Sequence, residues 1–263
     1  MLPAMAKSGK SRLGNVWIVG ASSGIGASLA RLMEACADNV AITARSADKL
    51  EVMQSAGKRL SAFPADISDK EAIADAVAEI EKRFSGIDLA VLCAGVWVPM
   101  AADEMDVGEM RRAMDINYFG VVDTVNALLP GMKARGGGRI VIVASVAGYR
   151  GLPTSAAYGP TKAALINLVE TLAIELSAWG IEVTIANPGF VDTPMARVNQ
   201  FKMPGLISAD TAAQKLLDGI IRHKPAIFFP FGFTSAIRLM NFLPTGLYYA
   251  LIRRMTGAGK RKG

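Results

Sequence analysis

The chain has 263 residues, with 29 Lys and Arg against 23 Asp and Glu, a formal net charge of +6. No acidic residue follows Asp218, so residues 1–218 hold 21 Lys and Arg against 23 Asp and Glu, and the positive excess belongs to the last part of the chain. A nucleic-acid-binding domain would spread basic residues over one face of the fold, so this distribution argues against nucleic acid as a partner. One His and two Cys are too few for a Cys/His cluster, and we predict no metal site.

Short β-branched runs alternate with amphipathic stretches along residues 13–230. This alternation is typical of a parallel sheet that helices cover on both faces. The expected strands are 15–20, 40–44, 60–64, 89–93, 139–144, 182–186 and 226–229. The expected helices are 24–35, 49–56, 70–84, 107–129, 157–179 and 209–223. We therefore predict a single doubly wound, Rossmann-like α/β domain with a seven-stranded, mostly parallel sheet.

A glycine turn joins the first expected strand to the first helix, with the sequence Gly-Ala-Ser-Ser-Gly-Ile-Gly over residues 20–26. Glycines at such a turn let backbone N–H groups approach a pyrophosphate, and the helix N-terminus favours the anion. The turn therefore predicts a dinucleotide site. The residues expected to contact the cofactor here are Gly20, Ser22, Ser23, Gly24, Ile25 and Gly26.

The same letters also match Gly-x-Ser-x-Gly, the nucleophile elbow of a serine hydrolase, with Ser22 as nucleophile. His223, the only His of the chain, would then be the base. A nucleophile after the first strand has no upstream strand to supply the second oxyanion donor. The hydrolase is therefore a remote alternative.

Arg45 and Ser46 follow the second expected strand, about twenty residues beyond the glycine turn. An acid at this point binds the ribose 2′-hydroxyl of NAD, whereas an Arg neutralises the 2′-phosphate of NADP. We therefore predict NADP(H) as the cofactor. The alternative is that Arg45 is an ordinary surface cation.

Asp66 and Ile67 follow the third expected strand, where folds of this kind line the adenine cleft. The spacing fits a cap for the next helix equally well, so both interpretations of Asp66 stay open.

The candidate acid and base is Tyr158, and Lys162 follows it by four residues at the start of a long expected helix. Such a pair alone can also be ordinary helix surface. This spacing puts the phenol and the ammonium on one helix face. A nearby cation favours the phenolate, so the phenol pKa is expected to fall toward neutrality. Ser145 ends the fifth expected strand at the same carboxyl edge of the sheet, which is where open α/β sheets bind ligands.

Together these residues resemble the short-chain dehydrogenase/reductase family over about residues 13–230. The glycine turn matches the family's cofactor motif, except that Val19 replaces the usual threonine. Leu92-Cys93-Ala94-Gly95 resembles the family's Asn-Asn-Ala-Gly stretch with both asparagines replaced. The residues that match the catalytic tetrad are Asn117, Ser145, Tyr158 and Lys162.

The resemblance implies a role for each of these four residues. Tyr158 exchanges a proton with the substrate oxygen, and Lys162 binds the nicotinamide ribose and lowers the phenol pKa. Ser145 orients the carbonyl, and Asn117 holds a relay water. Further contacts to the cofactor are expected from Ala94, Gly95, Pro188, Gly189, Val191 and Thr193.

The activity so implied is hydride transfer between NADP(H) and a carbonyl or secondary alcohol. A catalytically idle NADP-binding sensor or scaffold is the alternative. Apolar residues around the expected pocket favour a hydrophobic small-molecule substrate. The candidate substrate-pocket residues are Val96, Trp97, Tyr149, Leu152 and Met195. By resemblance, helices 107–129 and 157–179 are expected to form a homodimer or homotetramer interface.

Outside the α/β domain we expect a basic N-terminal extension over residues 1–12 and an apolar and basic appendage over residues 231–263. A substrate lid is expected at about residues 190–208. Pro and Gly divide the appendage into pieces shorter than the roughly 20 residues that span a bilayer. Two short amphipathic helices are expected, which either lie on an anionic membrane or pack over the pocket or a partner subunit. With no signal-peptide pattern at the N-terminus, we expect a cytoplasmic protein, with peripheral contact at the inner membrane surface left open.

Overall fold

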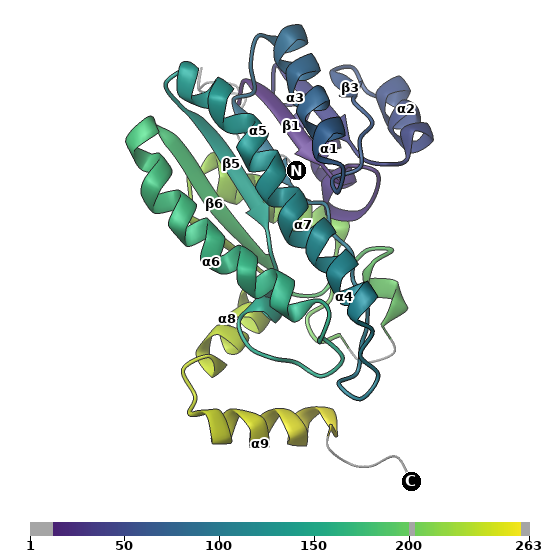
Figure 1. Cartoon of the computed structure of the whole chain (residues 1–263), viewed down its shortest axis with the longest axis vertical. Coiled ribbons are helices and arrows are strands. Elements are labelled where there is room, and N and C mark those ends of the chain that lie inside the picture. Colours follow the sequence, from purple (N-terminus) through teal and green to yellow (C-terminus); the bar gives the residue numbers. More distant parts are fainter. Residues whose placement is uncertain (1–12, 200–202, 259–263) are drawn as a thin grey trace.

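The computed structural model describes residues 13–199 and 203–258 (Figure 1). The basic extension predicted at residues 1–12, and residues 200–202 of the predicted lid, lie outside the described residues.

The central sheet has seven strands in the order β3-β2-β1-β4-β5-β6-β9, and all six neighbouring pairs are parallel. This order confirms the predicted doubly wound domain, because the chain moves outward from β1 in one direction and then returns to the other side. The strands are β1 Asn15–Val19, β2 Asn39–Thr43, β3 Leu60–Ala62, β4 Leu89–Leu92, β5 Gly138–Val143, β6 Ile181–Pro188 and β9 Ala226–Phe229.

Both faces of the sheet are buried, as successive residues of β1 illustrate. Val16 and Ile18 pack on one face, and Trp17 and Val19 pack on the other. The strands therefore read as continuous apolar runs. Trp17 is fully buried and its indole Nε1 donates to Thr43 Oγ1 at 2.8 Å, which satisfies its polar atom inside the core.

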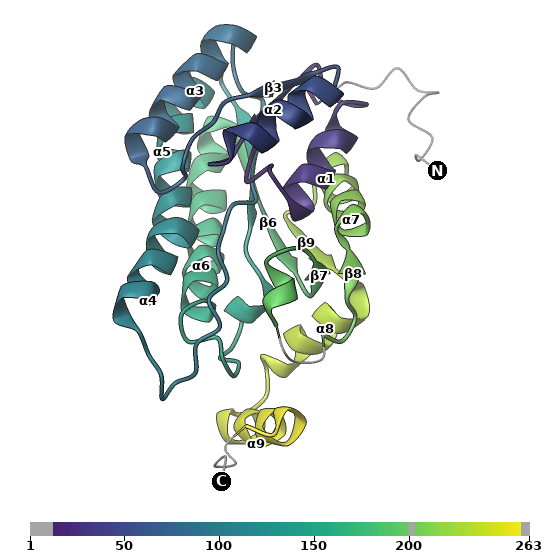
Figure 2. The same ribbon diagram turned by 90° about the vertical axis from the view of Figure 1, so that its right-hand side faces the viewer.

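Helices cover each face in two separate layers (Figure 2). One layer contains α3 (Lys70–Phe84), α5 (Gly120–Ala134) and α6 (Gly159–Glu175). The opposite layer contains α1 (Gly24–Met33), α2 (Ala47–Ala56) and α7 (Ala209–Ile221). The sheet edge between these layers, where the strands end, is left for the connecting loops.

The single helix predicted over 107–129 is wrong in its outline. The structure has α4 (Val107–Met114), a π-helical turn (Asp115–Phe119) and then α5, which continues past Pro130 to Ala134. A proline inside a helix costs about 3 kcal/mol. Leu128 and Met132, fully buried on either side of Pro130, anchor the helix to the sheet and outweigh that cost.

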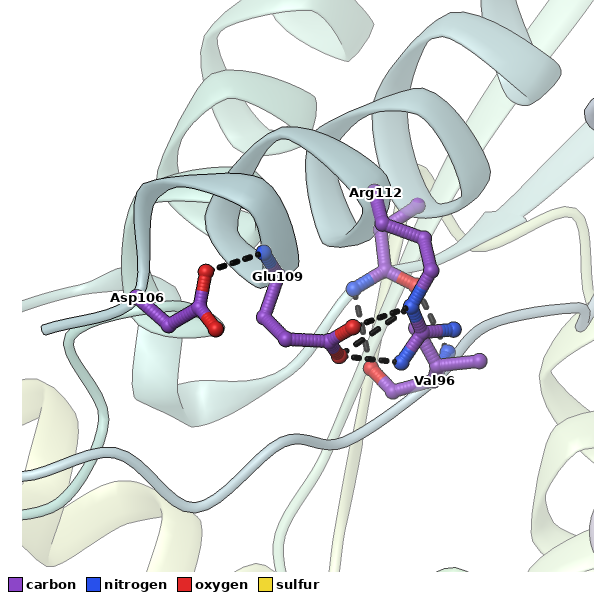
Figure 3. A network of polar contacts seen from close by, with 5 residues as sticks. Val96, Asp106, Glu109 and Arg112 are labelled. Carbon is purple, nitrogen blue, oxygen red and sulfur yellow. Dashed lines mark hydrogen bonds and ion pairs between the residues drawn. The ribbon is translucent and has the colours of Figure 1, made fainter.

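The start of α4 is fixed by side chains rather than by packing. Asp106 Oδ1 accepts from the Glu109 N–H at 3.1 Å, and Arg112 pairs with the Glu109 carboxylate at 2.6 Å (Figure 3). An N-cap followed by an i, i+3 ion pair is a local device that stabilises a short exposed helix.

The lid and the C-terminal appendage add small elements to the α/β domain. In the predicted lid, β7 (Val191–Asp192) pairs in parallel with β8 (Ile207–Ser208). The appendage forms α8 (Phe231–Met240) and α9 (Thr245–Thr256), and both views place α9 beyond the layers that cover the sheet (Figures 1 and 2). Within the described residues, no helix combines the length and apolar character that crossing a bilayer requires.

Candidate active site

A cavity of about 820 Å³ lies where the sheet strands end. It brings together every residue that the sequence predicts to contact the cofactor, from six separate segments of the chain. Those residues are Gly20, Ser22, Ser23, Gly24, Ile25, Gly26, Arg45, Ser46, Asp66, Ile67, Ala94, Gly95, Tyr158, Lys162, Pro188, Gly189, Val191 and Thr193. Ser145 and the substrate-pocket candidates Val96, Trp97, Leu152 and Met195 also line it. Two predicted site residues, Asn117 and Tyr149, are not among the described residues that line the cavity.

The glycine turn approaches the loop after β4 at backbone distance. Gly20 has a φ of +89°, and a Cβ at this position would lie 2.5 Å from the Ala94 backbone nitrogen. Only glycine tolerates both the positive φ and this contact. Glycine at position 20 therefore allows the glycine turn to pack against the loop after β4, and both segments line the cavity.

The start of α1 suits an anion. Ser23 occupies the N-cap position without a side-chain cap hydrogen bond within the described part of the chain, and the first turn of the helix carries no acidic residue. The first N–H groups of a helix need acceptors, and the helix dipole favours negative charge there. The residues present thus fit the pyrophosphate of a dinucleotide.

Arg45 and Asp66 face each other across the cavity rim, with Arg45 Nε 3.8 Å from an Asp66 carboxylate oxygen. The Arg45 side chain is 64% exposed, so this ion pair contributes little to stability and leaves the guanidinium able to turn to a ligand. Asp66 does not cap α3: Asp69 does, accepting from the Ala72 N–H at 2.9 Å. Asp66 instead accepts from the Ser68 backbone and hydroxyl, a local turn that holds it at the rim.

Tyr158 and Lys162 adopt the predicted spacing at the start of α6. Tyr158 is the N-cap residue, and its carbonyl accepts from the Lys162 N–H at 3.2 Å. Lys162 Nζ lies 5.6 Å from the Tyr158 ring centroid and donates to the Val143 carbonyl at 3.0 Å. Pro160 is tolerated in the first turn, where backbone N–H groups lack helical partners.

The predicted fall in the Tyr158 pKa is wrong. Burial raises the pKa of the Tyr158 phenol to about 12, while its hydrogen bond with Ser145 acts in the opposite direction. Burial also lowers the pKa of Lys162 to about 8, so the ammonium that was expected to stabilise a phenolate is itself disfavoured. Burial of both groups therefore opposes a phenolate at Tyr158.

Asn117 is fully buried in the π-helical turn rather than exposed to the cavity. Its Oδ1 accepts from the Val96 N–H at 2.7 Å, and its Nδ2 donates to the Val96 carbonyl at 2.9 Å and to Thr161 Oγ1 at 3.1 Å. A Cβ at Gly95 would lie 3.0 Å from Asn117 Oδ1, so any larger residue here would require the Asn117 side chain to shift. Asn117 thus holds the loop after β4 against the first turn of α6.

Trp97 fixes the orientation of the Tyr158 ring. The two rings meet edge to face, with centroids 4.9 Å apart, and the Trp97 indole nitrogen donates to Asn199 Oδ1 at 2.9 Å. Asn199, with Met255 and Thr256 of α9, also lines the cavity. The lid at about residues 190–208 and an appendage packed over the pocket were among the sequence expectations, but these three residues were not named. A polar residue in a lid and the end of an appended helix carry no local motif, so the sequence offers no signal for the individual residues.

Tyr149 was predicted to line the substrate pocket, and the structure turns it elsewhere. Its phenol interacts with Arg238 of α8, and burial raises its pKa to about 12. The appendage, whose position the sequence left open, packs against the segment that carries Tyr149.

The hydrolase alternative is contradicted by the placement of His223. Its Nδ1 lies 2.9 Å from a Glu182 carboxylate oxygen, at the amino end of β6. Ser22 follows the carboxyl end of β1, so the two side chains lie at opposite edges of a parallel sheet.

Cys93 lines the cavity beside Lys162, and its thiol gives the fold a predicted pH dependence. Burial raises the pKa of the Cys93 thiol to about 12 from an ordinary 9.0, and Lys162 acts in the opposite direction. Between these values Cys93 holds its proton in the folded state and loses it in the unfolded state, so its contribution to the free energy of unfolding falls as pH rises. Lys162, whose pKa burial lowers from 10.5 to about 8, contributes a rise over the lower part of this range. We expect Cys93→Ala to remove the falling contribution, so that the free energy of unfolding in urea declines less across that range than in wild type.

Cys36→Ala, at the thiol outside the cavity, is the matched control for this prediction. Tyr149 and Tyr158 still contribute a decline above pH 10 in both variants, since burial raises the pKa of each phenol from 10.0 to about 12. A Cys93→Ala protein whose unfolding free energy follows the wild-type pH curve would contradict the prediction.

The doubly wound sheet, the glycine turn and the Tyr158–Lys162 pair in one cavity define a nicotinamide-dependent oxidoreductase of the Rossmann type. Comparison with known proteins agrees with this class. The family model for short chain dehydrogenases matches residues 14–203. An uncharacterized oxidoreductase from Myxococcus xanthus is 32% identical over 242 residues, covering 90% of this chain and 96% of that protein. One from Staphylococcus saprophyticus is 32% identical over 68% of this chain and 79% of its own length.

Two solved structures share the fold. A short-chain dehydrogenase from Burkholderia cenocepacia, solved in complex with NADP, superposes with a TM-score of 0.81 at 24% identity, over 92% of this chain and 98% of that chain. One from Streptomyces avermitilis gives a TM-score of 0.78 at 27% identity, over 95% and 96% of the two chains. The chain therefore belongs to the short-chain dehydrogenase family and is an oxidoreductase of that family.

Proposed function

We propose that this protein transfers a hydride between NADP(H) and the carbonyl or secondary alcohol of a hydrophobic small molecule, with Tyr158 as general acid and base. The observation that carries the proposal is that Tyr158, Ser145 and Lys162 share one cavity with the glycine turn. The intact set also argues against the alternative of an idle NADP-binding sensor.

Different residues along the cavity are proposed to bind the cofactor and to act on the substrate. The start of α1 binds the pyrophosphate, Arg45 pairs with the 2′-phosphate, and Lys162 donates to the nicotinamide ribose. The bound nicotinamide supplies or accepts the hydride. Ser145 holds the substrate oxygen by a hydrogen bond, and Tyr158 exchanges the proton with that oxygen.

The hydrogen bond between the Tyr158 phenol and Ser145 supports the role of Tyr158 as proton donor. It places the phenol beside the residue that is proposed to hold the substrate oxygen, within reach of the oxygen that needs the proton. Trp97 holds the ring edge to face, which limits rotation of the ring away from Ser145. In this reading Asn117 is a positioning residue for the loop that carries Val96 and Trp97.

A hydrophobic substrate is supported by the wall of the cavity beyond the catalytic residues. The side chains there are mostly apolar, and they come from the loops after β4 and β5, the lid and the end of α9. They include Val96, Trp97, Leu152, Pro153, Met195 and Met255. Such a wall suits an aliphatic, aromatic or alicyclic carbonyl better than a sugar or a carboxylate.

The experiment that tests the reaction class is an NADPH-oxidation screen over aliphatic, steroidal and quinone carbonyls. We expect turnover of at least one apolar class. Tight NADPH binding without turnover of any of them, or of the matching alcohols with NADP, would favour the idle sensor.

The preference for NADP is tested by Arg45→Asp. A charge-assisted hydrogen bond contributes about 1.5 to 3 kcal/mol, so its loss is expected to weaken NADPH binding by roughly 10-fold to 100-fold. The new carboxylate also provides an acceptor for the 2′-hydroxyl of NADH. We therefore expect the ratio of the NADH and NADPH dissociation constants to shift toward NADH.

Arg31→Asp is the matched control, since the Arg31 side chain on α1 has a similar exposure of 59% and also pairs with a carboxylate. It should leave both dissociation constants unchanged. If Arg45→Asp leaves their ratio at the wild-type value, Arg45 is a surface cation and the 2′-phosphate assignment fails.

A homo-oligomer formed through α4, α5 and α6 is also part of the proposal. Large apolar side chains are exposed in the single chain on α4 (Val107), on the π-helical turn before α5 (Phe119), on α6 (Ile174) and on the turn after α6 (Trp179). Exposed apolar side chains of this size suit a subunit contact. Sedimentation velocity of wild type and Ile174→Glu tests it, with a smaller particle expected for the variant.

A further inference from the structure

The appendage is tied to the loop that borders the active-site cavity. Tyr248 Oη donates to the Gly151 carbonyl at 2.8 Å, and Arg150 donates to the Leu243 carbonyl at 2.9 Å while its guanidinium lies 4.0 Å from the Tyr248 ring centroid. Tyr248 and Ile252, four residues apart, are buried and turn one side of α9 toward this loop. At the end of the same helix, Met255 and Thr256 line the cavity.

A second hollow of about 400 Å³ lies beside α9. Leu152 and Pro153 line both hollows, and Tyr249 and Arg253 of α9 line the second. The appendage therefore borders the cavity and forms part of its rim.

Several exposed side chains of the appendage outside the second hollow are apolar or basic. Leu239 is 70% exposed and Phe242 is 84% exposed, which is unusual for large apolar side chains. Leu247 and Arg254 of α9 are exposed as well. We call the set Leu239, Phe242, Leu247 and Arg254 the docking face, and Arg253 is a further exposed cation of the same helix that lines the second hollow.

The charge of the docking face points to an anionic partner. No acidic residue occurs after Asp218, and the sequence adds Lys260, Arg261 and Lys262 beyond the described residues. A symmetric contact between two copies would bring together two faces that both carry positive charge and no acidic residue. The exposed Phe and Leu side chains favour a lipid surface over a nucleic acid, because burying them is favourable only in an apolar environment such as the acyl chains of a membrane.

We infer that the docking face binds an anionic membrane surface and so holds the cavity rim against the lipid. Apolar side chains enter the interface and arginines pair with the headgroups, as in amphipathic helices that lie on membranes. This inference goes beyond the proposed function and does not depend on it, since binding to lipid requires no turnover. It also gives an apolar substrate dissolved in the membrane a short route to Tyr158.

The test is co-sedimentation of the full chain with vesicles of phosphatidylcholine alone and of phosphatidylcholine mixed with phosphatidylglycerol. We expect pelleting with the mixed vesicles and a loss of pelleting at high salt. Arg254→Gln should weaken binding about fivefold, the effect of about 1 kcal/mol for one cation near an anionic surface. Phe242→Ser should weaken it by roughly tenfold through the lost apolar burial.

Matched controls lie on helices outside the appendage. Val52→Ser removes an exposed apolar side chain of α2, and Arg111→Gln removes an exposed cation of α4, and both should pellet like wild type. Circular dichroism of each variant verifies the fold.

Three results would overturn the inference. The first is wild-type protein that does not pellet with the mixed vesicles. The second is pelleting that Phe242→Ser and Arg254→Gln leave unchanged. The third is that the wild type forms a particle which Phe242→Ser dissociates, or binds DNA, without binding vesicles, which would assign the face to a second copy or to a nucleic acid.

Discussion

Replacing Tyr158 by Phe is expected to lower kcat for carbonyl reduction by about 10² to 10⁴, the usual contribution of a general acid or base. The variant removes the phenol oxygen that carries the proton and keeps the ring that packs against Trp97. The dissociation constant of NADPH should therefore stay close to the wild-type value. Steady-state kinetics and fluorescence titration with NADPH measure the two effects separately.

Tyr118→Phe is the control for this prediction, because it removes a phenol oxygen from a residue outside the described cavity wall. It should retain wild-type kcat. Turnover near the wild-type rate in Tyr158→Phe would assign the proton to another group, and the proposed roles of Ser145 and Lys162 would lose their basis.

Replacing Lys162 by Met is expected to weaken NADPH binding by roughly 10-fold to 100-fold and to lower kcat about 100-fold as well. The reason is that Lys162 is proposed to donate to the nicotinamide ribose, so both binding and positioning depend on it. Lys162→Met is thus expected to change both the NADPH dissociation constant and kcat, whereas Tyr158→Phe is expected to change kcat alone. Titration with NADPH and single-turnover kinetics distinguish the two variants.

Stability measurements separate this effect from misfolding. Burial lowers the pKa of Lys162 to about 8, which means that the fold disfavours its charged form. Replacing such a cation by an apolar side chain of similar length should leave the free energy of unfolding near or above the wild-type value. Lys215→Met, on the exposed side of α7, is the control. Unchanged NADPH affinity in Lys162→Met would contradict the ribose contact.

The sheet order and the dinucleotide turn could be predicted from sequence because they depend on local patterns. Apolar runs such as Val16–Val19 are buried on both faces, and a glycine turn must follow a strand whose carboxyl end meets a ligand. Residues 44–46 and 93–95 follow strands that end at the same edge, so parallel topology alone brings them into one cavity.

The environment of the catalytic residues could not be predicted in the same way. The spacing of Tyr158 and Lys162 indicates proximity but not burial, and burial dominates the pKa values of both groups. Asn117 lies in a π-helical turn, and its side chain forms hydrogen bonds with Val96, which lies 21 residues earlier in the loop after β4. The sequence around Asn117 does not show that this loop packs there. Tyr149 faces α8 because the appendage packs there, and no sequence pattern near Tyr149 predicts that contact.

The central claim is that this chain moves a hydride from NADPH to a carbonyl carbon with a proton from Tyr158. The most direct test is a reaction with NADPH that carries deuterium at both C4 positions, followed by mass spectrometry of the alcohol formed from an apolar carbonyl. The account predicts one deuterium on the carbinol carbon with wild type and almost none over the same time with Tyr158→Phe. Product without deuterium at that carbon, or equal labelling by the two proteins, would contradict it.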